Sequence, residues 1–177
     1  MALPFSKDFF TLFDLPVAYE IDGDELRRRY QGLQHAAHPD RHGQATDQER
    51  RLATQLASYI NEAYRTLKDP VTRARYLLEH WGVDMNAQSA VTDSAFLGEQ
   101  MMLREALAEL RAGQGPKAHL DTFLDDIVGR LQDLQAALGQ QLSSAQGPLQ
   151  KAHVTYDKMR FLQRLQEEAR DLAEELG

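Results

Sequence analysis

Two stretches of helical apolar periodicity, joined by the tripeptide His38-Pro39-Asp40, place the strongest constraint on the fold of this chain. Apolar residues recur every three or four positions, the period of an amphipathic helix, at Leu26, Tyr30, Leu33 and Ala37 upstream and at Leu52, Leu56, Tyr59 or Ile60, Ala63 and Leu67 downstream. Pro39 fixes its own φ and disfavours the α conformation at His38, so the first helix must end there. The sequence therefore predicts a helical hairpin with His38 and Asp40 on a stiffened tip, a geometry that suits docking to a partner.

Helix signals continue along the rest of the chain, and no segment has the alternation of a strand. We expect a short helix at about 7–13, the two hairpin helices from after Asp22 and over 47–68, and a fourth helix from just after Pro70 to about 80. Three longer helices follow, beginning near 92, 117 and 149, and Gly/Pro breaks separate them at 113–116 and 147–148. The predicted fold is all-α, with an N-terminal domain at 1–81, a linker at 82–92 and an antiparallel three-helix bundle at 93–177.

Composition excludes several classes of function. The chain has no cysteine, which excludes disulfides, thiolate nucleophiles and cysteine-ligated metal centres. Residues 1–80 carry 11 basic against 12 acidic side chains, and residues 81–177 carry 9 against 15, within a total charge of −7. The acidic second half argues against binding to nucleic acid and fits a basic protein partner. No apolar run reaches the ~20 residues needed to cross a bilayer, and the N-terminus has no signal-like pattern, so we expect a cytoplasmic protein without membrane association.

The first half of the chain resembles a J-domain. The resemblance rests on the His38-Pro39-Asp40 tripeptide, the opening segment 8–16 (DFFTLFDLP), and the segments 60–70 (INEAYRTLKDP) and 73–76 (RARY) in register behind it. A lone tripeptide would be a weak signal, whereas the tripeptide within its matching helices is a strong one. The resemblance implies an N-terminal J-domain that stimulates a chaperone ATPase.

The second half narrows the resemblance to the HscB family of J-proteins. The segments that carry it are 76–79 (YLLE), 81–84 (WGVD), 94–101 (SAFLGEQM), 103–105 (LRE) and 158–162 (KMRFL). The resemblance implies a co-chaperone of iron–sulfur cluster assembly that has no catalytic activity or cofactor of its own. Its partners would be an IscU-like scaffold protein, bound by the bundle, and a DnaK/HscA-like ATPase chaperone, contacted by the J-domain.

The resemblance also assigns residues to the chaperone contact. His38 would be a polar contact, Pro39 a rigid spacer, and Asp40 an anion offered to an arginine of the chaperone. The arginine run leading to the tip lies off the apolar stripe, which predicts that it faces solvent. These cations would meet an acidic patch on the chaperone; they are Arg27, Arg28, Arg29 and, beyond the tip, Arg41.

A second apolar stripe at the start of the bundle has two possible interpretations. Leu97, Met101 and Glu105 are offset from the stripe of Phe96, Leu103, Leu107 and Leu110, and such a stripe more often widens a core than forms an interface. In the HscB family the scaffold-binding patch falls on the offset stripe, with Glu109 continuing it and Phe161 contributed by the last helix. Gly98 and Met102 depart from the residues typical of close relatives, which carry a larger apolar residue and an acid there.

Two other functions stay open at this point. A general J-protein would serve unfolded clients, and its bundle would bind many apolar peptides without preference for a scaffold. A metal-dependent enzyme or metal sensor could use His35, His38 and His42, although Pro39 disrupts the helix that would align them and no Glu or Cys stands at matching spacing. We therefore expect no metal site and no enzyme.

Overall fold

The computed structural model describes residues 8–37, 46–87, 94–113 and 117–176, and these residues form helices and no strand. The chain divides into two compact units, Met1–Leu77 and Leu78–Gly177. The all-α, two-domain fold expected from the sequence is confirmed. Within the described ranges, no helix is long and apolar enough to span a lipid bilayer.

In the described part of the first unit, four helices begin: α1 (Phe9–Leu12), α2 (Gly23–Ala37), α3 (Asp47–Lys68) and α4 (Pro70–His80). Their starts follow from local chemistry. The Asp22 carboxylate accepts hydrogen bonds from the amides of Asp24 and Glu25, at 2.9 and 3.1 Å. Thr46 and Glu49 form a capping box, in which each side chain accepts from the other's amide. Pro70 occupies the first position of α4, where its missing N–H removes no hydrogen bond.

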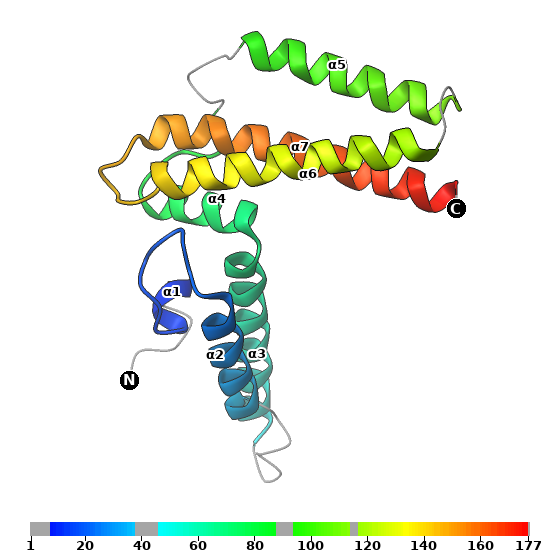
Figure 1. Ribbon diagram of the computed structural model, residues 1–177. Coiled ribbons are helices and arrows are strands. Elements are labelled where there is room, and N and C mark those ends of the chain that lie inside the picture. The colour runs from blue at the N-terminus through cyan, green and yellow to red at the C-terminus, as the bar shows by residue number, and fades with distance from the viewer. Residues whose placement is uncertain (1–7, 38–45, 88–93, 114–116, 177) are drawn as a thin grey trace. The chain divides into compact units, whose positions relative to one another are not determined.

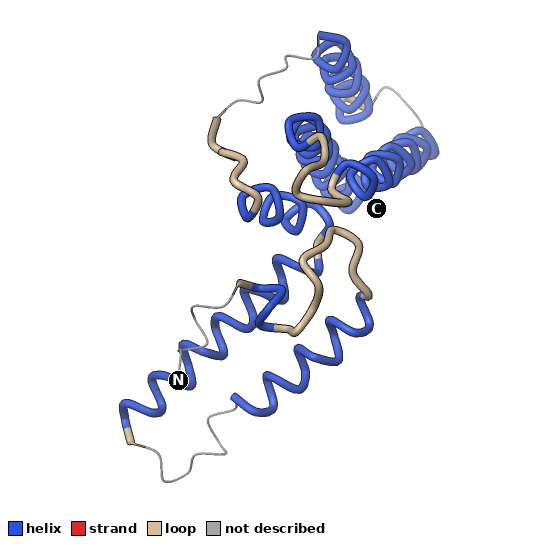
Figure 2. The backbone as a smooth tube through the Cα atoms, turned by 90° about the vertical axis from the view of Figure 1, so that its left-hand side faces the viewer, coloured by secondary structure: helices blue, strands red, loops and turns tan. Residues whose placement is uncertain are grey.

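Helices α2 and α3 lie side by side as the predicted hairpin (Figures 1 and 2). Tyr30 and Tyr64 stack between them with ring centroids 4.0 Å apart. The Asn61 side-chain oxygen accepts hydrogen bonds from the Tyr30 hydroxyl at 2.9 Å and from the Gln34 amide at 2.6 Å. These contacts fix the register of α2 on α3. The stripe predicted from the sequence is buried or half-buried apart from Leu52, which is exposed.

The second unit contains α5 (Ser94–Arg111), α6 (Lys117–Gln141) and α7 (Leu149–Glu175). Helix α6 packs along α7, and α5 packs more sparsely against the same helix (Figure 1). An apolar core cluster takes side chains from all three helices: Leu103, Leu107, Leu120, Ile127, Leu162, Leu165, Ala169 and Leu172. At the polar surface, Arg130 of α6 pairs with both Glu99 of α5 and Asp126. The predicted three-helix unit is therefore present.

The turn between α6 and α7 requires a glycine. A Cβ atom placed on Gly147 would lie 2.5 Å from the carbonyl oxygen of Gln141, closer than any side chain tolerates. Pro148 follows at the N-cap of α7. The Gly-Pro break predicted from the sequence therefore falls at the point where the chain reverses.

Candidate functional site

The sequence predicts a chaperone contact at the tip of the hairpin. His38, Pro39, Asp40 and Arg41 lie outside the described residues. Helix α2 ends at Ala37 and α3 begins at Asp47, so the tripeptide belongs to the segment that joins the two helices of the hairpin. Its contact with a chaperone stays a prediction.

Two arginines near the start of α2 form an exposed basic face. The side chains of Arg27 and Arg28 are 61% and 75% exposed, and among the described residues each pairs with an acid three residues earlier on the same helix. The Arg27–Asp24 pair is 3.6 Å long. Both partners of the Arg27–Asp24 pair are exposed, and such pairs contribute about 0–1 kcal/mol to stability, so a partner's carboxylate could replace Asp24 at little cost.

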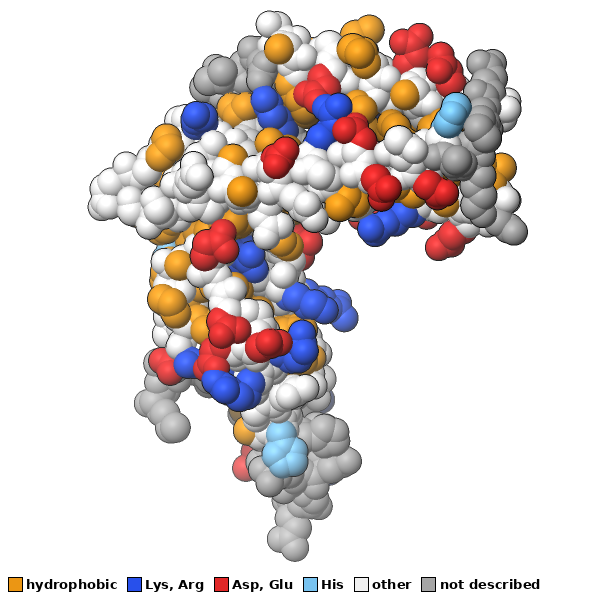
Figure 3. All heavy atoms as spheres, in the orientation of Figure 1, with side chains coloured by type: hydrophobic (Ala, Val, Ile, Leu, Met, Phe, Trp, Pro, Cys, Tyr) orange, Lys and Arg blue, Asp and Glu red, His pale blue; other side chains and the backbone are white. Residues whose placement is uncertain are grey.

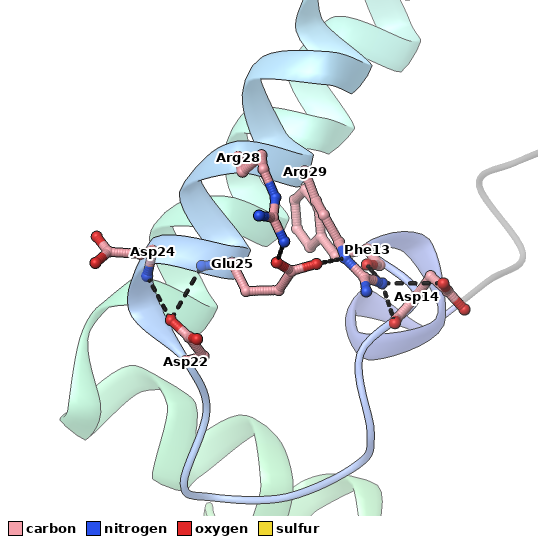
Figure 4. A network of polar contacts seen from close by, with 7 residues as sticks. All are labelled: Phe13, Asp14, Asp22, Asp24, Glu25, Arg28 and Arg29. Carbon is pink, nitrogen blue, oxygen red and sulfur yellow. Dashed lines mark hydrogen bonds and ion pairs between the residues drawn. The ribbon is translucent and has the colours of Figure 1, made fainter.

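Arg29 is only partly exposed, whereas the stripe analysis predicted that it faces solvent. Its side chain is 31% exposed, and its guanidinium lies against the loop that follows α1 (Figure 4). There it donates a 2.7 Å hydrogen bond to the Phe13 carbonyl and pairs with the Asp14 carboxylate at 3.0 Å, while Glu25 holds its other side. The apolar periodicity of α2 identifies the side of the helix that packs on α3. It does not show that the loop after α1 packs against another side of α2.

A buried tyrosine–arginine pair anchors the start of α4 in the first unit. The Arg73 guanidinium lies 5.0 Å from the centre of the Tyr19 ring and donates a 2.6 Å hydrogen bond to the Leu67 carbonyl. Burial raises the pKa of the Tyr19 hydroxyl to about 12, and Arg73 partly opposes that rise. Burial also lowers the pKa of Arg73. Arg73 belongs to the RARY segment of the J-domain resemblance, and this contact gives it a structural role.

The offset stripe on α5 lies at the surface and not in the core. Leu97 is 50% exposed and Met101 is 73% exposed, and the neighbouring Met102 is 71% exposed. Glu105 and Glu109 continue the exposed surface toward the end of α5. Figure 3 shows hydrophobic side chains reaching the surface over α5 with acidic side chains beside them. We call these five residues the α5 patch. The interpretation that this stripe widens the core is wrong for Leu97 and Met101.

Phe161 of α7 lies between the core and the surface. It is half-buried and packs against the core of the second unit. Its ring meets Phe96 of α5 edge-to-face, with centroids 5.7 Å apart. The Arg104 guanidinium lies 5.6 Å from the Phe161 ring centre. Phe161 is thus a structural link between α5 and α7 as well as a predicted contact residue.

Beside Phe161, α5 and α7 enclose a groove that sequence reasoning missed. The groove has a volume of about 250 Å³ and is lined from α5 by Gln100 and Arg104, and from α7 by Asp157, Arg160, Phe161, Arg164, Leu165 and Glu168. Its three arginines stand on two helices that are far apart in the sequence, so no motif reveals them. We call it the arginine groove.

No group of three His, Asp or Glu residues suited to a metal ion occurs within the described part of the chain. The metal-site interpretation depended on His38 and His42, which lie outside it. His35 is exposed on the last turn of α2. The expectation of no metal site therefore stays a prediction.

Comparison with known proteins bears on both units. Residues 13–76 match the DnaJ domain model, and residues 92–170 match the model described as the HSCB C-terminal oligomerisation domain. A solved structure, the chaperone HscB from Vibrio cholerae, is 36% identical with a TM-score of 0.84, and the alignment covers 97% of this chain and 100% of that one. This chain belongs to the HscB family of J-domain co-chaperones.

Two further solved structures are similar to this chain. The human co-chaperone protein HscB is 26% identical with a TM-score of 0.83, covering 93% of this chain and 81% of the human chain. The Jac1 co-chaperone from Saccharomyces cerevisiae is 24% identical with a TM-score of 0.74, covering 94% of each chain, and supports the fold alone. The HscB resemblance expected from the sequence is confirmed.

Proposed function

We propose that this HscB-family protein binds an IscU-like iron–sulfur scaffold and delivers it to a DnaK/HscA-like chaperone, whose ATPase it stimulates. The observation that carries the proposal is the exposed α5 patch in the same chain as a J-domain. Exposed apolar side chains that gather on one helix with an acidic border are typical of a protein-binding surface. The protein would act without catalytic chemistry of its own. Because it has no cysteine, it would handle the carrier of the cluster and not ligate the cluster through thiolates.

The proposed division of labour assigns one contact to each unit. The J-domain would meet the chaperone through the tripeptide at 38–40, with Arg27, Arg28 and Arg41 as surrounding cations. Arg29 would act indirectly, because its guanidinium is occupied by the loop after α1. The second unit would bind the scaffold through Leu97, Met101 and Phe161, with Glu105 and Glu109 as an acidic border that suits a basic surface.

The proposal is tested with the purified full chain, an IscU-like scaffold and a DnaK/HscA-like ATPase. We expect saturable binding to the scaffold, and we expect the scaffold to increase the ATPase stimulation produced by this protein. A set of unrelated apolar peptides serves as the competitor. If those peptides displace the scaffold at similar concentrations, the protein is a general J-protein for unfolded clients and the scaffold-specific function is wrong.

A further inference from the structure

The arginine groove carries positive charge within the acidic half of the chain. Three guanidinium groups and two carboxylates line it, which leaves a net charge of +1 at neutral pH. Residues 81–177 as a whole carry 9 basic against 15 acidic side chains. The groove is therefore positively charged within an acidic surrounding. The group that binds in it should be negatively charged, unlike the basic surface expected to meet Glu105 and Glu109.

The groove arginines keep their hydrogen-bond donors available. Within the described part of the chain, none of Arg104, Arg160 and Arg164 forms an ion pair. Arg104 lies over the Phe161 ring at 5.6 Å and Arg160 lies near the Tyr156 ring at 6.0 Å. An aromatic contact uses the flat face of a guanidinium and leaves the N–H groups at its edge for an acceptor. Planar, bidentate acceptors such as carboxylates match that edge best.

We infer that the arginine groove binds a single carboxylate from an Asp or Glu side chain of the scaffold protein. Its location supports the same partner, because Gln100 and Arg104 directly precede Met101 and Glu105 on α5, and Phe161 lines the groove. The net charge of +1 matches one carboxylate, whereas Asp157 and Glu168 would repel a polyanion such as nucleic acid. The volume of about 250 Å³ is below the ~300–1,000 Å³ typical of small-molecule sites. The inference rests on the proposed function, since it names a further contact with that scaffold.

A matched pair of substitutions on α7 tests this contact. Arg164→Gln removes one positive charge from the groove, and Arg170→Gln removes one from an exposed position on the same helix that does not line it. Each variant is titrated with the purified scaffold. Arg164→Gln should bind about tenfold more weakly, because it loses one charge-assisted contact, and Arg170→Gln should bind with an unchanged Kd. Arg164→Lys keeps the charge but not the planar fork, so its affinity should fall between wild type and Arg164→Gln.

A charge exchange identifies the occupant. Scaffold variants with single Asp or Glu residues changed to Lys are titrated against wild type and against Arg164→Glu. One scaffold variant should bind the wild-type protein more weakly and bind the Arg164→Glu variant with recovered affinity. Thermal unfolding of Arg164→Glu is measured first to check that this variant is folded. If Arg164→Gln and Arg170→Gln bind the scaffold equally, or no exchange restores binding, the groove inference is wrong while the proposed function stands. If wild type itself fails to bind the scaffold, the proposed function is wrong.

Discussion

At the scale of single residues, Arg29 and Tyr19 hold the segment between α1 and α2 by different forces. Arg29 supplies charged hydrogen bonds to the Phe13 carbonyl and the Asp14 carboxylate. Tyr19 is fully buried and contributes apolar area beneath Arg73. Because these two side chains are buried or half-buried while Arg27 and Arg28 are exposed, substitution of Arg29 or Tyr19 should affect folding, and substitution of Arg27 or Arg28 should affect binding.

The first prediction concerns His38 at the hairpin tip. His38→Gln should abolish stimulation of the chaperone ATPase, because a polar contact at the tip would be lost, and should leave scaffold affinity unchanged. Polar substitutions outside a core usually change stability by less than about 0.5 kcal/mol. The measurement is steady-state ATP hydrolysis beside a scaffold titration. Stimulation near the wild-type level would remove His38 from the contact.

The second prediction concerns Tyr19 and alkaline pH. The pKa of the Tyr19 hydroxyl is raised from its ordinary value of 10.0 to about 12 in the folded chain, mainly by burial. An unfolded chain would release this proton first as the pH rises, so the contribution of Tyr19 to stability is complete below pH 10 and is lost progressively between pH 10 and 12. Urea unfolding of Tyr19→Phe should therefore show a shallower loss of stability than wild type over this interval. Identical slopes would show that Tyr19 does not titrate with unfolding.

At the scale of elements, the sequence predicted the helices well because their ends have local causes. Asp22, Thr46, Pro70 and Gly147 each act within a few residues of where they stand. The stripe of the hairpin predicted its packing for the same reason. The role of Arg29 and the arginine groove could not be predicted, because each depends on two segments that meet only after folding. The hairpin tip followed from periodicity and Pro39, but its contact with a chaperone could be predicted only through the J-domain resemblance.

The third prediction concerns the basic face of α2. Charge reversal of Arg27 and Arg28 to Glu should weaken chaperone stimulation, because both side chains are exposed and would face an acidic surface. The wild-type effect should also decrease with salt, since the screening length is about 10 Å at 0.1 M. The control reverses Arg50 and Arg51, which are exposed on α3. Stimulation that falls equally for both pairs would indicate a general charge effect.

The fourth prediction separates interface from core on α5 and α7. The double substitution Leu97→Ala and Met101→Ala should weaken scaffold binding at least about tenfold, since the residues at the centre of an interface contribute most of its binding energy. It should leave the melting temperature nearly unchanged, because both residues are exposed. Adding Phe161→Ala should weaken binding further and also lower stability, by less than the ~3–5 kcal/mol of a fully buried Phe. Leu176→Ala, which removes another exposed apolar side chain, is the control.

Binding titration and thermal unfolding of the same variants distinguish the outcomes. Early melting of the Leu97/Met101 variant would place these side chains in the core. Normal scaffold affinity together with normal melting would show that the α5 patch is surface without this function. ATPase stimulation measured without scaffold should stay at the wild-type level in all of these variants, because the J-domain is unaltered.

At the scale of the whole molecule, the proposed function depends on the covalent link between two units with different partners. Linking two binding modules turns the second association into an intramolecular one, at an effective concentration in the mM range for short linkers. The linker that the sequence predicts at 82–92 would therefore have a role that neither domain carries by itself. This role is measured by the extra ATPase stimulation that the scaffold produces.

The fifth prediction tests that link by lengthening it. Insertion of 20 or 40 Gly/Ser residues after Gln88 should leave scaffold affinity and scaffold-free stimulation unchanged, because each unit keeps its own surface. The extra stimulation produced by the scaffold should fall with length, since effective concentration decreases roughly as the −3/2 power of linker length once the linker exceeds the span. Melting of the inserted variants checks that both units remain folded. If the extra stimulation were independent of linker length, the scaffold would act on the chaperone without being held there by this protein, and delivery by tethering would be wrong.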